Sequence, residues 1–360
     1  MGQSPDSDSY NDNEDGIPFF QGNADFGEKY PTTRKWCNAP TKIAHAEDIL
    51  ISVRAPIGAL NYAKEECCIG RGLAAITPNQ DKVSSEFIYW LLKGKHKELN
   101  LQGTGSTFKA ISRKVLEKIK VPDIELKKQT ELAGNLEKVY SVIQLRKQQL
   151  EELDTLIKAR FVEMFGDPVS NSFDLPEKTL PELGEFGRGV SKHRPRNDAR
   201  LLGGPYPLIQ TGEVASAGLY IDSYSNTYSE LGLQQSKMWS KGTLCITIAA
   251  NIAKTAILNF DACFPDSVVG FKANENNNNV FIHYWFTFFQ AILESQAPES
   301  AQKNINLKIL SELKVIAPEK SRQEEFAAFV TQVDKLKVAV QESLDELQTL
   351  FDSLMQQYFG

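Results

Sequence analysis

Residues 122–127 carry two carboxylates and a lysine, Asp123, Glu125 and Lys127, which are the side-chain types of many nuclease active sites. Only one residue separates the two carboxylates, whereas such sites usually take them from separate strands. The Asn/Asp-Pro-Pro-Tyr/Phe motif expected of an adenine methyltransferase is absent, and no glycine-rich turn follows a clear strand as in a cofactor site. We therefore expect no catalytic residue and no cofactor bound by this chain.

The cysteines and histidines do not form a metal-binding pattern. There is no C-x-x-C pair and no histidine at zinc-ligand spacing from a cysteine. The cysteines are Cys37, Cys67, Cys68, Cys245 and Cys263. We expect reduced thiols and no bound metal.

Residues 103–109, with the sequence GTGSTFK, could present backbone amides and hydroxyl groups to a phosphate. A helix is expected from Ser112 onward, and the N-terminus of a helix favours anions. The candidate contacts are Thr104, Ser106, Thr107 and Lys109. A plain capping turn is an equally good interpretation. The aligned positions in the second half, Gln302, Lys303 and Asn304, carry side chains that can pair with guanine or adenine edges.

Arg54 ends an expected strand and precedes a turn, which is a position for a loop that enters a DNA groove; a surface salt bridge is the alternative. Other polar loop residues are weaker candidates for DNA contact. They are Gln21, Asn23, Arg34, Lys35 and Arg71 in the first half, and Gln210, Thr211, Asn251 and Lys254 in the second. A basic run follows at Arg188, Lys192, His193, Arg194, Arg196 and Arg200. Only Asp198 opposes this run in the sequence, although a solvated loop would have the same composition.

The net charge of −6 argues mildly against nucleic acid as a partner, because phosphate contacts require Lys and Arg. The acidic excess is, however, concentrated in residues 319–360, which carry 8 acidic and 4 basic side chains. This segment is expected to be a helix that faces protein, so the charge of the remaining chain is nearly balanced.

The sequence contains one internal repeat at an offset of 194 residues. Phe165 and Gly166 recur as Phe359 and Gly360, and Gln129 recurs as Gln323. Upstream of these positions, ISRKVLEKIKV at residues 111–121 matches INLKILSELKV at residues 305–315 without a gap. Each half therefore follows the same plan.

Each repeat ends in an expected amphipathic helix of about 35 residues, about 50 Å long. Apolar residues recur there at intervals of three and four, which predicts a seam that packs against a partner helix. In the first helix the seam is Leu132, Leu136, Val139, Ile143, Leu150, Leu153 and Ile157. In the second it is Phe326, Val330, Val333, Val340, Leu344, Leu347 and Phe351, interrupted by Lys337.

The remaining segments combine short β-like runs with turn residues, and we expect an α+β fold with a pseudo-two-fold internal repeat. The predicted strands are residues 49–53, 73–77, 244–248 and 267–271, and the predicted short helices are residues 87–92 and 283–289. Asn-rich residues 274–279 are expected to form a polar loop. The predicted organisation is two globular domains, residues 1–124 and 167–318, and two helices, residues 125–166 and 319–360.

This plan resembles the specificity subunit of Type I restriction-modification systems over essentially the whole chain. GIPFFQGNADFG from Gly16, ILISVRAPIG from Ile49 and GTGSTFKAISRKVLEKIKVP from Gly103 look like the target recognition domain of that family. The second half keeps the last motif in looser form, as ESAQKNINLKILSELKV from Glu299.

The resemblance implies a non-catalytic subunit whose two recognition domains each read one half of a bipartite, asymmetric site in double-stranded DNA. It implies two long helices that pack antiparallel as a coiled coil and set the spacer between the half-sites. Two modification subunits would dock on these helices and bring S-adenosylmethionine and the adenine methyltransferase centre. Motor-nuclease restriction subunits can join such complexes.

The first half departs from this plan, because about 20 residues precede Arg188 in the second domain and have no counterpart before Met1. We therefore expect the opening strand of the first domain to be missing. A non-catalytic coiled-coil adaptor that binds proteins is the alternative function. The sequence has no membrane-spanning apolar run, and its polar, acidic N-terminus is unlike a signal peptide, which predicts a cytoplasmic protein without a membrane partner.

Overall fold

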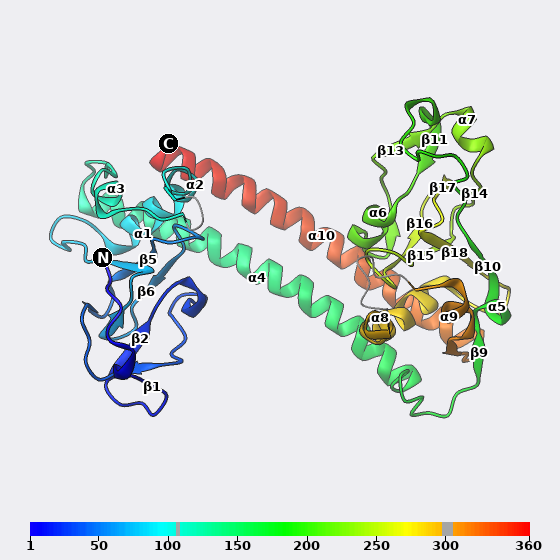
Figure 1. Ribbon diagram of the computed structural model, residues 1–360, viewed down its shortest axis with the longest axis horizontal. Helices are drawn as coiled ribbons and strands as arrows, with labels where there is room; N and C mark the ends of the chain where they lie inside the picture. Colours follow the sequence, from blue (N-terminus) through cyan, green and yellow to red (C-terminus); the bar gives the residue numbers. More distant parts are fainter. Residues whose placement is uncertain (106–108, 297–304) are drawn as a thin grey trace. The chain divides into compact units, whose positions relative to one another are not determined.

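Two helices of 40 residues each, α4 (Leu126–Phe165) and α10 (Lys320–Phe359), organise the chain. The structure is a computed structural model that describes residues 1–105, 109–296 and 305–360 (Figure 1). It divides into unit 1, which comprises Met1–Gln148 and Gln341–Gly360, and unit 2, which comprises Gln149–Val340. Both long helices therefore contribute one end to each unit.

Unit 1 combines short strands with three small helices and the beginning of α4. Its strands are β1 (Tyr10–Asn11), β2 (Ile17–Phe20), β3 (Trp36–Cys37), β4 (Ile43–Ala44), β5 (Ile49–Ser52), β6 (Leu60–Tyr62), β7 (Cys67–Ile69) and β8 (Leu73–Ile76). Its helices before α4 are α1 (Ser85–Gly94), α2 (His96–Leu101) and α3 (Arg113–Glu117), with 3-10 turns η1 (Ser7–Ser9) and η2 (Asn23–Asp25).

Unit 2 repeats and extends this arrangement. Its strands are β9 (Glu177–Thr179), β10 (Gly184–Arg188), β11 (Leu202–Leu208), β12 (Tyr220–Ile221), β13 (Asn226–Tyr228), β14 (Met238–Trp239), β15 (Leu244–Thr247), β16 (Thr255–Leu258), β17 (Ala262–Cys263), β18 (Val268–Ala273) and β19 (Lys314–Ile316). Its shorter helices are α5 (Leu180–Leu183), α6 (Thr211–Ser216), α7 (Glu230–Gln234), α8 (Asn279–Gln296) and α9 (Leu307–Glu312), with the 3-10 turn η3 (Ala199–Leu201).

The two units share a sheet plan that follows the sequence repeat. In unit 1 the strand order β6-β5-β8 forms an antiparallel sheet, and β2 pairs in parallel with β7. In unit 2 the corresponding β16-β15-β18 strands are antiparallel neighbours, and β11 pairs in parallel with β17. These elements confirm the expected α+β class, and the predicted strands and short helices all occur, with slightly different bounds except for α8, which is much longer than predicted.

The long helices begin at Leu126 and Lys320, six residues before Leu132 and Phe326, the first residues of the apolar seam. A buried glutamine holds each start in place. The Gln129 side chain accepts a hydrogen bond from the Ser84 amide at 3.0 Å and donates one to the Ile124 carbonyl at 2.7 Å. Gln323 repeats this pattern with the Asn278 amide and the Pro318 carbonyl. Buried polar groups need such partners, so a polar residue can anchor the helix.

Within each unit the two long helices run antiparallel. In unit 1 the end of α10 packs against the start of α4, where Phe351 lies 5.8 Å from Tyr140 and 5.6 Å from Trp90 between ring centres. In unit 2 the end of α4 packs against the start of α10 through Phe161 and Phe326. All of the proposed seam residues are buried or half-buried. Lys337, which interrupts the seam, forms an ion pair with Asp154 of α4 at 2.6 Å.

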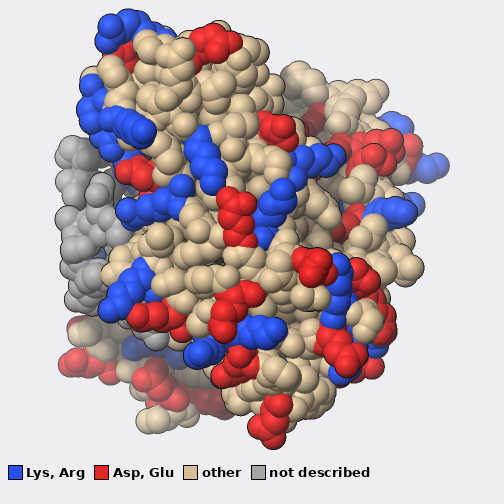
Figure 2. All heavy atoms as spheres, turned by 90° about the vertical axis from the view of Figure 1, so that its right-hand side faces the viewer, with Lys and Arg blue, Asp and Glu red and all other residues tan. Residues whose placement is uncertain are grey.

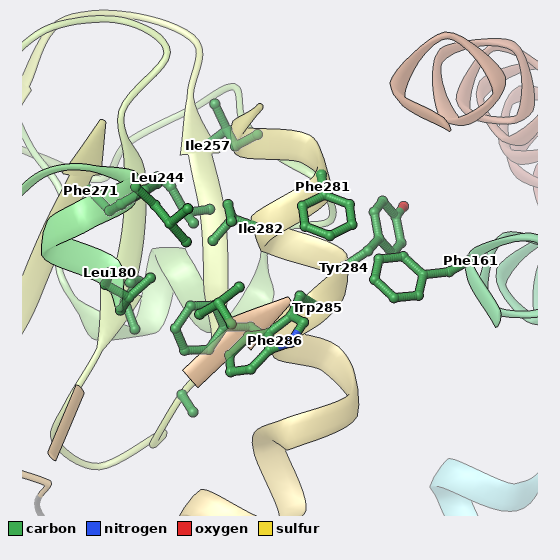
Figure 3. Packing of buried hydrophobic residues seen from close by; sticks show 14 of the residues in the cluster. Phe161, Leu180, Leu244, Ile257, Phe271, Phe281, Ile282, Tyr284, Trp285 and Phe286 are labelled. Carbon is green, nitrogen blue, oxygen red and sulfur yellow. The ribbon is translucent and has the colours of Figure 1, made fainter. Parts of the chain in front are cut away.

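The core of unit 2 lies between its main sheet and the long helices, with α8 in the middle (Figure 3). One side of α8 packs against the sheet through Ile282, Trp285 and Phe286. The other side presents Phe281 to Phe161 of α4, with ring centres 5.3 Å apart and nearly parallel planes. The helix extends beyond the predicted residues 283–289 at both ends, from Asn279 to Gln296. Asn279, expected in a loop, begins it, and its side chain donates a hydrogen bond to the Gly242 carbonyl.

The stability of unit 2 should depend on pH through His283 of α8. Burial, with a smaller contribution from the charge of Lys337, lowers the pKa of His283 to about 4. Because the unfolded chain binds this proton near pH 6.5, stability is fully present above that pH and is lost as the pH falls toward 4. We expect His283→Gln to reduce the loss of unfolding free energy between pH 7 and pH 5 by about 2 kcal/mol. Urea unfolding at both pH values measures this difference, and an equal loss in both proteins would contradict it.

Candidate nucleic-acid interface

A shallow hollow of about 210 Å³ in unit 1 brings together several of the residues singled out from the sequence. It is lined by Gln21, Gly22, Asn23, Arg54, Ala55, Arg71 and Gly72. These residues come from three separate segments of the chain. The hollow therefore forms only in the folded domain, and it collects two guanidinium groups and two amide side chains at one place.

Strand pairing explains why these segments meet. The amide of Gly70 donates to the Phe20 carbonyl at the end of β2, and the amide of Gly72 donates to the Gln21 carbonyl. The Val53 amide, just after β5, donates to the Gly72 carbonyl at 2.9 Å. A Cβ atom at Gly72 would lie 2.3 Å from the Gln21 carbonyl oxygen, so only glycine permits this close approach. The three segments thus end side by side.

The two arginines of the hollow are available for an external partner. Both Arg54 and Arg71 are exposed. Within residues 1–105, 109–296 and 305–360, neither side chain forms an ion pair or a side-chain hydrogen bond. A guanidinium group can bind a phosphate or the O6 and N7 atoms of guanine with two parallel hydrogen bonds. Gln21 and Asn23 can pair with adenine in the same way.

The loop before α3 lies beside Arg54. Isolated bridges pair Ala110 with both Arg54 and Thr104, and the Ala55 amide donates to the Lys109 carbonyl at 3.0 Å. Thr104 and Lys109 are both exposed, and the proposed contacts Ser106 and Thr107 lie outside the described residues. Because α3 has only five residues, its dipole adds little to anion binding.

Two other candidates of the first half do not line this hollow. Arg34 and Lys35 lie in the loop that leads into β3, and the Lys35 ammonium is 4.0 Å from the Asp12 carboxylate. Both partners of this pair are exposed, so its contribution to stability is small.

Unit 2 repeats the backbone arrangement with different side chains. Gln210 follows β11 as Gln21 follows β2, and it precedes α6, which begins at Thr211. The turn between β15 and β16 contains exposed Asn251 and half-buried Lys254. The Ile305 amide donates to the Ile248 carbonyl at 3.0 Å, as the Ile111 amide donates to the Val53 carbonyl in unit 1. Gln302, Lys303 and Asn304 lie outside the described residues.

The basic run of unit 2 is more fully neutralised than the sequence suggested. Asp266 pairs with Arg194 at 3.6 Å and also with Arg196, so a carboxylate from outside the run opposes it in addition to Asp198. Asp266 is far from the run in sequence and reaches it because the turn before β18 folds back. In the strand region the structural equivalence is shifted by one residue to 195, since the Val53 carbonyl corresponds to that of Ile248, and Asp266 therefore takes the place of Arg71. Figure 2 shows the molecule from the side of unit 2, where basic and acidic side chains are interspersed.

Asp198 pairs with two further residues of the basic run, Arg200 and His193. Its carboxylate lies 2.7 Å from the Arg200 guanidinium and 3.0 Å from Nε2 of His193. The hydrogen bonds from Arg200 hold the pKa of Asp198 well below its ordinary value, so this carboxylate stays ionised. Lys192 and Arg188 remain exposed; Arg188 is the last residue of β10.

A family comparison decides where this arrangement belongs. The sequence model described as "Type I restriction modification DNA specificity domain" matches residues 1–155 and again residues 176–348. The chain belongs to this family. The two matched stretches correspond to the two halves of the internal repeat, so each unit carries a Type I specificity domain.

Curated relatives in the same class support this assignment. The chain is 43% identical over 154 residues to a protein named as a type I restriction enzyme specificity subunit from Methanocaldococcus jannaschii, covering 43% of this chain and 36% of the relative. It is 27% identical over 227 residues to a second such subunit from that organism, covering 59% of this chain and 52% of the relative. The chain thus matches about a third and about half of the length of these relatives.

Two solved structures have a fold similar to that of this chain. An S subunit from M. genitalium matches with a TM-score of 0.53 at 17% identity, covering 100% of this chain and 92% of that one. A chain from a structure of a type I R-M system matches with a TM-score of 0.58 at 17% identity, covering 95% and 91%. Among the described residues, no helix combines the length and apolar character needed to cross a membrane.

Proposed function

We propose that this chain is the DNA-recognition subunit of a Type I restriction-modification complex. Each unit reads one half of a bipartite, asymmetric site in double-stranded DNA. The hollow of unit 1 carries this proposal, because exposed Arg54 and Arg71 lie there with two amide side chains, close to the exposed residues Thr104 and Lys109. This combination of cations and base-reading amides is suited to DNA.

In this proposal the chain itself is not catalytic. Modification subunits, two per chain, dock on α4 and α10 and supply S-adenosylmethionine and the adenine methyltransferase centre. Motor-nuclease subunits can join the complex. Membership of the specificity family favours this function over a protein-binding adaptor.

Titration of the complex with duplex DNA at several salt concentrations tests the proposal. Affinity for DNA should fall linearly with the logarithm of the salt concentration, with a slope proportional to the number of phosphates neutralised. The chain with its modification subunits should also methylate DNA, whereas the chain alone should not. Binding that does not depend on salt would favour the adaptor, and methylation by the isolated chain would contradict a non-catalytic role.

The lengths of α4 and α10 give a second test of this function. We expect that inserting four residues between Gln148 and Gln149, together with four between Val340 and Gln341, lengthens the preferred spacer between half-sites. These points are the boundaries of the two units, so neither core is interrupted. Four helical residues add about 6 Å, which is about two base-pair steps of DNA.

Sequencing of methylated bases in cells that carry the altered complex measures the spacer. Insertion into one helix alone is the control, because the two helices would then differ in length and methylation should be lost. An unchanged spacer after the double insertion would show that the helices do not set it.

A further inference from the structure

Asp266 of unit 2 lies at the position that Arg71 has in unit 1. The carbonyl of the residue after Asp266 accepts a hydrogen bond from the Ile248 amide at 3.0 Å. The carbonyl of the residue after Arg71 accepts the same bond from the Val53 amide at 2.9 Å. A position that carries a guanidinium group in the hollow of unit 1 therefore carries a carboxylate in unit 2.

The backbone around Asp266 is held in place from two sides. The Val268 amide donates a hydrogen bond to the Pro265 carbonyl at 3.0 Å, which closes a turn around Asp266. The bond from the Ile248 amide joins this turn to the end of β15. Both Pro265 and Val268 are buried. The carboxylate of Asp266, which is 36% exposed, is therefore a fixed charged group at the surface of unit 2.

Arg194 connects this carboxylate to the loop that carries the basic run. Its Nη1 atom donates hydrogen bonds to the carbonyls of Ser191 and His193, at 2.6 and 2.9 Å. Its Nη2 atom lies 3.6 Å from Oδ2 of Asp266. These contacts use both hydrogens of Nη1 and fix the plane of the guanidinium group, so Arg194 holds the loop and Asp266 together.

Arg196 is held at one corner only. Its Nη2 atom donates a hydrogen bond to Oδ1 of Asp266, the second oxygen of the same carboxylate. Within the part of the chain that the structure describes, the Arg196 side chain has no other ion pair or hydrogen bond. It is 46% exposed. Because a guanidinium group has several N–H donors, most of those of Arg196 remain for an external partner.

A guanidinium group held in this way is suited to reading guanine. Guanine presents O6 and N7 as paired acceptors in the major groove, and a planar guanidinium group can donate to both. A side chain that is already oriented loses less conformational freedom on binding than one that rotates freely. The negative charge of Asp266 also repels DNA phosphates. Both effects favour a base contact of Arg196 over a phosphate contact.

We propose that Arg196 reads a guanine in the half-site of unit 2 and that Asp266 is its positioning residue. Asp266 holds the guanidinium group in the orientation that the base requires and keeps it from binding phosphates. In the hollow of unit 1, Arg54 and Arg71 have no such carboxylate partner among the described residues, so the two units present guanidinium groups differently. This inference rests on the proposed function of the chain in DNA recognition.

Selection from a library of duplex DNA with randomised bases tests the base contact. The full chain, assembled with its modification subunits, is incubated with the library, and the bound DNA is sequenced. We expect the wild-type complex to enrich a bipartite site. Arg196→Ala should reduce the preference at one G·C pair of one half-site about five- to tenfold and leave the other half-site unchanged. Asp266→Asn should reduce the preference at the same base pair, because it acts through Arg196.

Binding to a duplex of random sequence, measured by fluorescence anisotropy, separates positioning from a merely structural role. Asp266→Asn should increase the affinity for this DNA about two- to fivefold, because the released Arg196 can then bind a phosphate. The slope of log affinity against log salt concentration should increase in magnitude by about one. Adding Arg196→Ala to Asp266→Asn should abolish both increases.

Two further variants control for charge and for folding. Asp261→Asn makes the same charge change at a carboxylate that accepts a hydrogen bond from the Lys241 amide, and it should leave base preference and random-DNA affinity unchanged. Asp266→Glu keeps the charge and decides the test if Asp266→Asn lowers the midpoint of thermal unfolding. It should retain wild-type affinity for random DNA but weaken the guanine preference, because the longer side chain displaces the guanidinium group.

Three outcomes would overturn the inference while the proposed function stands. The first is that Arg196→Ala changes no base preference, or changes it at an A·T pair. The second is that Asp266→Asn affects a different base pair from Arg196→Ala, because Asp266 would then contact a base itself. The third is that Asp266→Asn folds normally and does not bind random DNA more tightly. A wild-type complex that enriches no site would instead overturn the proposed function, and this inference with it.

Discussion

Replacing Phe161 with alanine is expected to lower the unfolding free energy of unit 2 by about 3–5 kcal/mol. Phe161 is 0% exposed and contacts four other rings, those of Phe165, Phe281, Phe288 and Phe326, with centroid distances of 5.0–5.3 Å. These rings come from α4, α8 and α10. Truncation leaves a cavity where three helices meet, and that site cannot collapse without moving a helix.

Val162 provides the matched control because it is the next residue of α4 and is 39% exposed. Val162→Ala should change stability by less than about 1 kcal/mol. Urea unfolding followed by tryptophan fluorescence measures both variants, since Trp285 lies in the same core. Equal effects of the two substitutions would show that the aromatic cluster does not hold α4 to unit 2.

Arg54→Ala combined with Arg71→Ala is expected to weaken duplex DNA binding by the assembled complex about 10- to 100-fold. Both guanidinium groups are free of intramolecular ion pairs with described residues, so both are available for DNA. If both contact phosphates, the affinity falls about equally for all DNA sequences. The slope of log affinity against log salt concentration then decreases in magnitude by about two. If either contacts guanine, the loss is concentrated on DNA that carries the preferred half-site.

The basic run of unit 2 supplies a contrasting pair of arginines. Arg194→Ala with Arg196→Ala removes the same formal charge, but Asp266 already neutralises part of it. We expect a smaller loss of affinity and a smaller change in the salt slope than for Arg54 and Arg71. Fluorescence anisotropy with labelled duplexes at matched salt concentrations compares the two double variants. A larger effect of the unit 2 pair would place the stronger contact there instead.

The repeat made the fold class accessible from sequence, because the offset of 194 residues aligned both long helices and the segments before them. Strands with a continuous apolar run, such as Ile49–Ser52 and Leu244–Thr247, were also predictable. The strands β10 and β11 were not. Each contains two glycines, and β11 also contains two prolines, so local propensity opposes a strand and only tertiary pairing enforces it.

For the hollow in unit 1, the sequence predicted individual residues but not that they lie together. Polar side chains after strand ends pointed to Gln21, Asn23 and Arg54, but their proximity depends on the parallel pairing of β2 with β7, which no local pattern reveals. The ion pairs of Asp266 with Arg194 and Arg196 were missed for the same reason.

The division of each long helix between two units sets the order in which the chain can fold during its synthesis. Unit 2 is a continuous stretch, Gln149–Val340, and its core is complete once that stretch has left the ribosome. Unit 1 begins first but requires Gln341–Gly360, whose Phe351 and Phe359 pack against Trp90 and Phe87. At about 5–20 residues per second, roughly 10–40 seconds separate the appearance of Gln148 from that of Gln341. During that interval the apolar surface of unit 1 that receives Phe351 and Phe359 stays exposed.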